Sequence, residues 1–122
     1  MRIIFNKSVM LVDDSKFMRN LLRKIIVSNG YYVVAEAGSG EDAVTLYKSH
    51  FPHIVLLDIT LPNMNGIATL KEIKKINPNA RVVMCSALGT QDLIIEALEN
   101  GAADFIVKPF FDELITQLNK IY

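Results

Sequence analysis

Four short, mostly apolar segments of this sequence are each followed by side chains that could do chemistry. The segments and the residues after them are 9–12 with Asp13 and Asp14, 54–57 with Asp58, 81–85 with Ser86, and 104–107 with Lys108. Three carboxylates in one place would repel one another and raise at least one pKa. A divalent cation with few protein ligands and several waters, the usual arrangement of Mg²⁺, would offset that charge. We therefore expect the three aspartates to form a Mg²⁺ site.

A carboxylate beside Mg²⁺, an ammonium and a hydroxyl could accept a phosphoryl group. Asp58 is the candidate acceptor, since it ends an unbroken apolar run, 54–57, that is typical of a strand buried on both faces. The metal and Lys108 would stabilise the phosphoryl oxygens, and Ser86 would donate a hydrogen bond to one of them. Each of these side chains alone is more often a capping or solvated residue. The prediction of a phosphoryl acceptor therefore requires that these side chains lie close together in the fold.

The alternation of apolar and helical patterns predicts how they meet. Strands are expected at about residues 9–12, 31–35, 54–57, 81–85 and 104–107, with helices between Ser15 and Gly30 and at about 41–49, 67–76, 91–100 and 111–121. This order favours an α/β fold, a flavodoxin-like doubly wound five-stranded parallel sheet of order 2-1-3-4-5 with five helices on two faces. Strands one, three, four and five are then neighbours, and their carboxyl ends share one edge.

Two of the expected helices carry several apolar residues, some expected in the core and some facing solvent. The first has apolar residues at helical spacing, most of them expected in the core, namely Phe17, Met18, Leu21, Leu22, Ile25 and Ile26. The fourth contains three adjacent apolar residues, Leu93, Ile94 and Ile95, which span too wide an arc for one buried stripe. At least one of these three is expected to face solvent.

Composition limits the class of protein. A chain of 122 residues, 51% hydrophobic, is long enough for one domain with a substantial core. Thirteen basic and thirteen acidic residues balance, which gives no electrostatic reason to expect nucleic-acid or membrane binding. The single cysteine, Cys85, is expected to pack in the core and fits a reducing, cytoplasmic location. We find no apolar segment long enough for a signal peptide or a membrane span.

Four motifs together resemble the receiver domain of two-component response regulators, most closely the single-domain chemotaxis type. They are Val-Asp-Asp-Ser at 12–15, Leu-Leu-Asp-Ile-Thr-Leu-Pro-Asn-Met-Asn-Gly at 56–66, Cys-Ser-Ala at 85–87 and Gly-Ala-Ala-Asp-Phe-Ile-Val-Lys-Pro-Phe at 101–110. The resemblance covers about residues 7–121. Because the chain ends directly after the last expected helix, we expect a single receiver domain over residues 1–122.

The resemblance implies roles for the site residues. Asp58 would be the phosphoacceptor, in a signalling domain that catalyses only its own phosphorylation and dephosphorylation. Asp14 would bind Mg²⁺ directly, Asp13 chiefly through water, and Thr60 through its backbone carbonyl. Ser86 would be the switch hydroxyl and Lys108 would pair with the phosphoryl group.

The resemblance also implies how a signal leaves the domain. Phe105 would be the switch aromatic, at a position where many chemotaxis relatives carry Tyr. Ile94 would lie on the output surface formed by the fourth helix, fifth strand and fifth helix, and Leu88 would shield the acyl phosphate from water. The expected partners are a sensor histidine kinase, docking near Phe17 and Met18, and a downstream protein such as a flagellar switch, with no direct contact with nucleic acid.

For two other classes of function this sequence lacks a required feature, and a third alternative remains open. A haloacid-dehalogenase-type phosphatase needs a second Asp two residues after the first, where this chain has Thr60. A flavodoxin-type flavin binder needs a neutral phosphate loop after strand one, where Asp13 and Asp14 would repel a phosphate. A receiver that is part of a longer regulator remains an alternative to the single-domain prediction.

Overall fold

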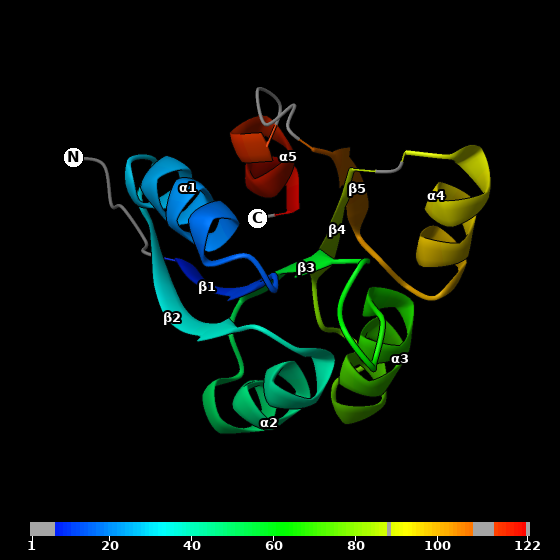
Figure 1. Ribbon diagram of the computed structural model, residues 1–122. Helices are drawn as coiled ribbons and strands as arrows, with labels where there is room; N and C mark the ends of the chain where they lie inside the picture. The colour runs from blue at the N-terminus through cyan, green and yellow to red at the C-terminus, as the bar shows by residue number, and fades with distance from the viewer. Residues whose placement is uncertain (1–6, 88, 109–113, 122) are drawn as a thin grey trace.

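A five-stranded parallel sheet forms the centre of the protein (Figure 1). The structure is a computed structural model that describes residues 7–87, 89–108 and 114–121. In chain order its elements are β1 (Lys7–Val12), α1 (Lys16–Val27), β2 (Tyr31–Ala37), α2 (Gly40–His50), β3 (Ile54–Asp58), α3 (Gly66–Ile76), β4 (Val82–Ser86), α4 (Gln91–Glu99), β5 (Asp104–Val107) and α5 (Leu114–Ile121). The strand order is β2-β1-β3-β4-β5, which confirms the predicted flavodoxin-like topology.

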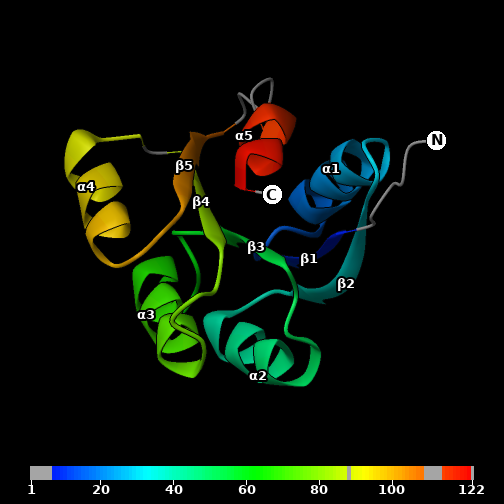
Figure 2. The same cartoon turned by 180° about the vertical axis from the view of Figure 1, so that it is seen from behind.

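The helices divide between the two faces of the sheet (Figures 1 and 2). On one face α1 and α5 pack through Leu22, Ile26, Leu114 and Leu118. On the other, α2, α3 and α4 contribute a second apolar cluster that includes Tyr47, Leu70 and Ala97. All five residues of β3 and of β4 are buried, as an unbroken apolar run between two helical layers predicts.

The predicted element boundaries agree with the structure to within a few residues. The largest differences are in β1 and β2, which extend from Lys7 and to Ala37 because the two strands pair along their whole length. Residues 111–113, the predicted start of the last helix, lie outside the described part of the chain, as do Leu88 and Pro109. The expected helix stop at Gly30 is confirmed by its φ of 90°, a conformation that favours glycine.

Phe17 corrects the expected apolar face of the first helix. Its side chain is 76% exposed, whereas the helix buries Leu22 and Ile26. Phe17 lies in the first turn of α1, two residues after the cap residue Ser15, whose hydroxyl accepts a hydrogen bond from the Met18 N–H (3.2 Å). Its spacing from Leu22 and Ile26 places it off the stripe that meets the sheet.

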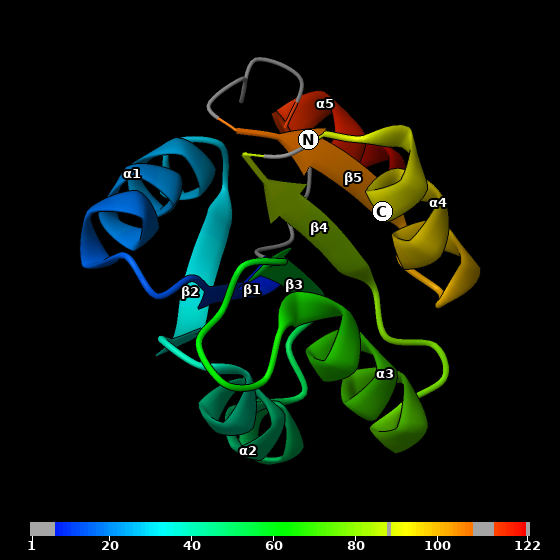
Figure 3. The same cartoon turned by 45° about the vertical axis from the view of Figure 1, so that its right-hand side comes forward.

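Parallel register brings the strand ends together. Val12 is paired with Leu57, and Asp58 with Cys85, so the residues that follow β1, β3 and β4 leave the sheet at similar heights. Ser86 is in turn paired with Val107 on β5, and β4 and β5 run side by side in the same direction in Figure 3. The predicted meeting of four strand ends at one edge is therefore a consequence of the sheet.

Gly66 lets the loop after β3 return to α3 against the end of that strand. Its N–H donates to the carbonyl of Ile59 (2.7 Å). A Cβ at this position would lie 2.2 Å from the Asp58 carbonyl oxygen and 2.5 Å from the Ile59 Cα. Both neighbours are backbone atoms, so they have no flexible side chain that could move aside.

We therefore expect Gly66→Ala to lower the free energy of unfolding by about 2 kcal/mol or more, since overpacking forces backbone shifts. Urea unfolding monitored by circular dichroism measures the change. Gly38→Ala is the matched control, because a Cβ at Gly38 meets only the Arg19 Nη1 atom at an ordinary 3.7 Å. It should change the free energy by less than about 0.5 kcal/mol. Equal effects of the two substitutions would contradict the close backbone approach.

Candidate functional site

Three carboxylates gather at the carboxyl edge of the sheet. One ligand oxygen each from Asp13, Asp14 and Asp58 lies within 4.8 Å of the others. Asp13 and Asp58 are 2% and 6% exposed, whereas Asp14 is open to solvent. Hard oxygen donors with one open side fit a divalent cation that keeps several of its waters. The donor set therefore fits Mg²⁺, and the predicted convergence of the three aspartates is confirmed.

Hydrogen bonds hold both the side chain and the backbone of the buried Asp13. Its carboxylate accepts from the Ser15 N–H at Oδ1 (2.9 Å) and from Lys108 Nζ at Oδ2 (2.5 Å). Its backbone N–H donates to the Ala37 carbonyl (3.0 Å), and its own carbonyl accepts from Arg19 Nη1 (2.5 Å). With both carboxylate oxygens and both backbone groups bonded, Asp13 has little freedom to move.

Lys108 is the cation of the site. Its Nζ lies 2.5 Å from Asp13 Oδ2 and 3.3 Å from Asp58 Oδ2, and its side chain is 11% exposed. Burial alone would lower the pKa of Lys108, but the hydrogen bond to Asp13 and the charges of both carboxylates outweigh it and raise that pKa. Lys108 therefore stays charged, and its ammonium interacts with two aspartates at once.

Asp58 holds its proton more tightly than an ordinary aspartate. Burial raises the pKa of Asp58 and the nearby charge of Asp13 adds to the effect, while Lys108 and the Thr60 N–H oppose it. That N–H donates to Asp58 Oδ1 at 3.2 Å. The ionised form of Asp58 is thus destabilised by its surroundings, and an added cation would stabilise it.

The remaining predicted site residues differ in position. Ser86 is fully buried at the end of β4, one residue after Cys85, which pairs with Asp58, and its carbonyl accepts from the Lys108 N–H (2.7 Å). Phe105 is half-buried against the α2–α3–α4 side of the core. Thr60 is exposed in the loop after β3. Leu88 lies outside the described residues, so its predicted shielding role stays a prediction.

The predicted exposure of apolar residues on α4 is confirmed, though not chiefly at Ile94. Ile94 is partly buried, whereas Ile95 and Leu98 are 45% and 48% exposed. The two exposed residues are three apart and so share one face of the helix. The predicted packing of Cys85 is also confirmed, since it is buried and desolvation raises the pKa of its thiol to about 12.

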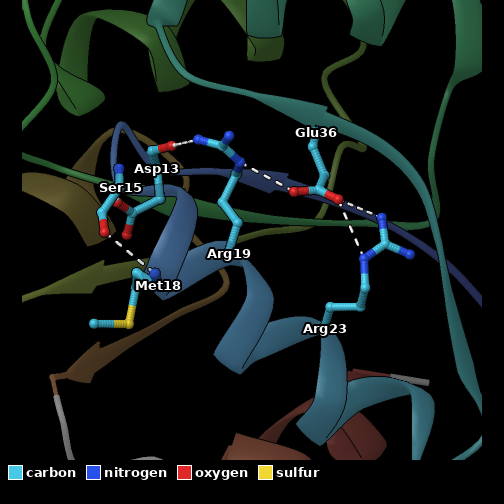
Figure 4. A network of polar contacts seen from close by, with 6 residues as sticks. All are labelled: Asp13, Ser15, Met18, Arg19, Arg23 and Glu36. Carbon is cyan, nitrogen blue, oxygen red and sulfur yellow. Dashed lines mark hydrogen bonds and ion pairs between the residues drawn. The ribbon is translucent and has the colours of Figure 1, made fainter.

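A polar network beside the carboxylates was not predicted (Figure 4). Arg19 on α1 donates to the Asp13 carbonyl and to Glu36 Oε1 on β2 (3.0 Å), and Arg23 donates to Glu36 Oε2. The four-residue spacing of the two arginines places them on one side of α1 and is the only signal in the sequence. It does not reveal the carbonyl as a partner.

Comparisons with known proteins agree on one family. Residues 9–119 match the response regulator receiver domain. Chemotaxis protein CheY of Bacillus subtilis (strain 168) is 51% identical over 92% of this chain and 94% of that protein, and chemotaxis protein CheY of Thermotoga maritima is 52% identical over 94% and 97%. A chain in the crystal structure of the CheX-CheY-BeF3-Mg+2 complex from Borrelia burgdorferi is similar with a TM-score of 0.91 and 41% identity, covering 94% of this chain and 88% of that chain.

Across residues 7–87, 89–108 and 114–121, no helix is both long enough and apolar enough to cross a membrane.

Because the pKa of Asp58 is raised, its ionised form costs the folded state free energy at neutral pH. We expect Asp58→Asn to raise the free energy of unfolding at pH 7 in EDTA, by about 1 kcal/mol. The gain should vanish as the pH falls below the ordinary value of 3.8, where Asp58 is protonated in both states. Urea unfolding at a series of pH values measures it.

Asp14→Asn is the matched control, because Asp14 is exposed and its charge stays solvated. It should give a smaller gain at pH 7. A gain from Asp58→Asn that does not depend on pH would show that burial of the charge is not its cause.

Proposed function

Because this chain belongs to the response regulator receiver domain family, we propose that Asp58 accepts a phosphoryl group from a phosphohistidine of a sensor histidine kinase. Receiver domains act as phosphoacceptor signalling modules. The observation that carries the proposal is the position of Asp58, a buried carboxylate with Lys108 Nζ 3.3 Å away and two further aspartates within reach of a shared cation. The proposed activity is confined to the domain's own phosphorylation and dephosphorylation.

In the proposed transfer, a carboxylate oxygen of Asp58 attacks phosphorus. The new P–O bond forms as the P–N bond to the imidazole breaks, and the electron pair of that bond leaves with the ring nitrogen. Lys108 is close enough to follow the added charge, since it already bonds one oxygen of Asp58. Ser86, at the end of the neighbouring strand, is the proposed hydroxyl donor to a phosphoryl oxygen.

Mg²⁺ is the proposed cofactor, and when bound it would neutralise charge on the carboxylates and on the phosphoryl oxygens. Asp14 is the proposed direct ligand because it is exposed, and the Thr60 carbonyl is the proposed backbone ligand. Asp13 would act chiefly through water, since both of its carboxylate oxygens already accept hydrogen bonds from Ser15 and Lys108.

The proposed output surface is the face of α4, β5 and α5. Phe105 on β5 would change its packing as Ser86 moves toward the phosphoryl group, and Ile94 would lie on the same face. The exposed Ile95 and Leu98 support a protein partner here. We propose a flagellar switch or another effector as that partner. Matches that span nearly the whole of both chemotaxis relatives support a single domain over residues 1–122.

Phosphorylation is tested with acetyl phosphate and Mg²⁺, followed by intact mass spectrometry. We expect the mass to increase by one phosphoryl group, because acetate can leave from phosphorus as the imidazole does. Asp58→Asn should remove the increase, and EDTA should reduce it strongly. Asp104→Asn is a control at an aspartate on β5 outside the carboxylate cluster, and it should be phosphorylated like the wild type. Phosphorylation that survives Asp58→Asn would refute the proposed acceptor.

Metal binding is tested by thermal unfolding. Mg²⁺ at about ten times its Kd should raise the free energy of unfolding by about 1.4 kcal/mol, since it binds the folded state alone. Asp14→Ala should abolish this increase without unfolding the protein, because its side chain is exposed. An increase that persists in Asp14→Ala would mean that the cation binds elsewhere.

A further inference from the structure

We infer that Arg19 is a positioning residue for divalent-cation binding, which it supports by fixing the backbone at the start of the Asp13–Asp14 peptide. The inference rests on the metal site of the proposed function and deepens it. Arg19 is not itself a ligand, since a guanidinium has no acceptor atom. Its effect would pass through the carbonyl of Asp13, to which its Nη1 donates at 2.5 Å.

The guanidinium of Arg19 is held by two partners on different elements. Besides the Asp13 carbonyl, it donates through Nε to Glu36 Oε1 at 3.0 Å, and its side chain is 17% exposed (Figure 4). A planar guanidinium that bonds two acceptors in fixed directions loses most of its freedom to rotate. Arg19 therefore joins the loop after β1 to the neighbouring strand β2.

Glu36 is a firm anchor for this connection. It lies on β2 in register with Leu11, so it moves with the sheet. A hydrogen bond from Arg23 lowers the pKa of Glu36, and the bond from Arg19 and the charges of both arginines lower it further, against the effect of burial. Glu36 thus keeps its negative charge at neutral pH and holds the guanidinium of Arg19 in place.

The consequence for the metal site lies in Asp14. Its side chain is exposed, so the backbone that carries it sets the point from which its carboxylate must reach a cation. Arg19 fixes that backbone at the Asp13 carbonyl, and the Ser15 N–H, bonded to Asp13 Oδ1, fixes it on the other side of Asp14. Groups that orient metal ligands in this way commonly change metal affinity by about tenfold or more when they are removed.

Arg23 offers a control with the same change of charge. Arg19→Gln and Arg23→Gln each remove one positive charge and one partner of Glu36, but only Arg19 bonds the Asp13 carbonyl. Purified full-length proteins are titrated with Mn²⁺, with free Mn²⁺ followed by electron paramagnetic resonance, and then with Mg²⁺ in competition. We expect Arg19→Gln to weaken binding of both cations about tenfold. Arg23→Gln should change it less than about twofold.

Arg19→Lys tests the geometry at constant charge, and it replaces Arg19→Gln if that variant does not fold. A single ammonium cannot reproduce the planar fork, so binding should still weaken, by about threefold or more. Equal affinities in Arg19→Gln and Arg23→Gln, or wild-type affinity in Arg19→Lys, would overturn the inference. A wild-type protein that binds no Mn²⁺ would instead refute the metal site of the proposed function, and the inference with it.

Discussion

Repulsion among three carboxylates is the constraint on which the rest of this site depends. Asp13 and Asp58 are buried and Asp14 lies close to both, so the folded chain must offset negative charge where little water can screen it. Lys108 does so in part, by contacts of 2.5 Å with Asp13 and 3.3 Å with Asp58. Burial, with the charge of Asp13 adding to it, still raises the pKa of Asp58 in spite of Lys108. A site with such a deficit of positive charge favours any cation that reaches it.

The parallel sheet is what makes this concentration of charge possible. The side chains of the core strands pack into two apolar layers, one on each face of the sheet. Polar side chains are therefore found where the strands end. Register then sets the spacing, since Val12 pairs with Leu57 and Asp58 with Cys85. The apolar core and the acidic site are therefore two results of one arrangement, and a shift in register would disturb both.

Much of this could be predicted from the sequence, because strand ends and helix caps are local features. The order of strands and the convergence of the three aspartates with Lys108 followed from apolar runs and their final residues. The contact of Arg19 with the Asp13 carbonyl could not be predicted, since every residue has a carbonyl and spacing does not show which one is reached. The exposure of Phe17 was missed, although its spacing from Leu22 and Ile26 places it off the buried stripe of α1.

The bond between Lys108 and Asp13 has a thermodynamic consequence for signalling. It joins residues that follow β5 and β1, which are separated in the sheet by β3 and β4. The Lys108 ammonium therefore contacts both Asp13 and Asp58. A phosphoryl group on Asp58, as proposed, would compete with Asp13 for that ammonium. The phosphorylated state would gain only the difference in free energy between the contact of Lys108 with the phosphoryl group and its contact with Asp13. Because the net gain is smaller than the full energy of the new contact, a two-state equilibrium of this kind is sensitive to additional energies, such as those of a docking partner.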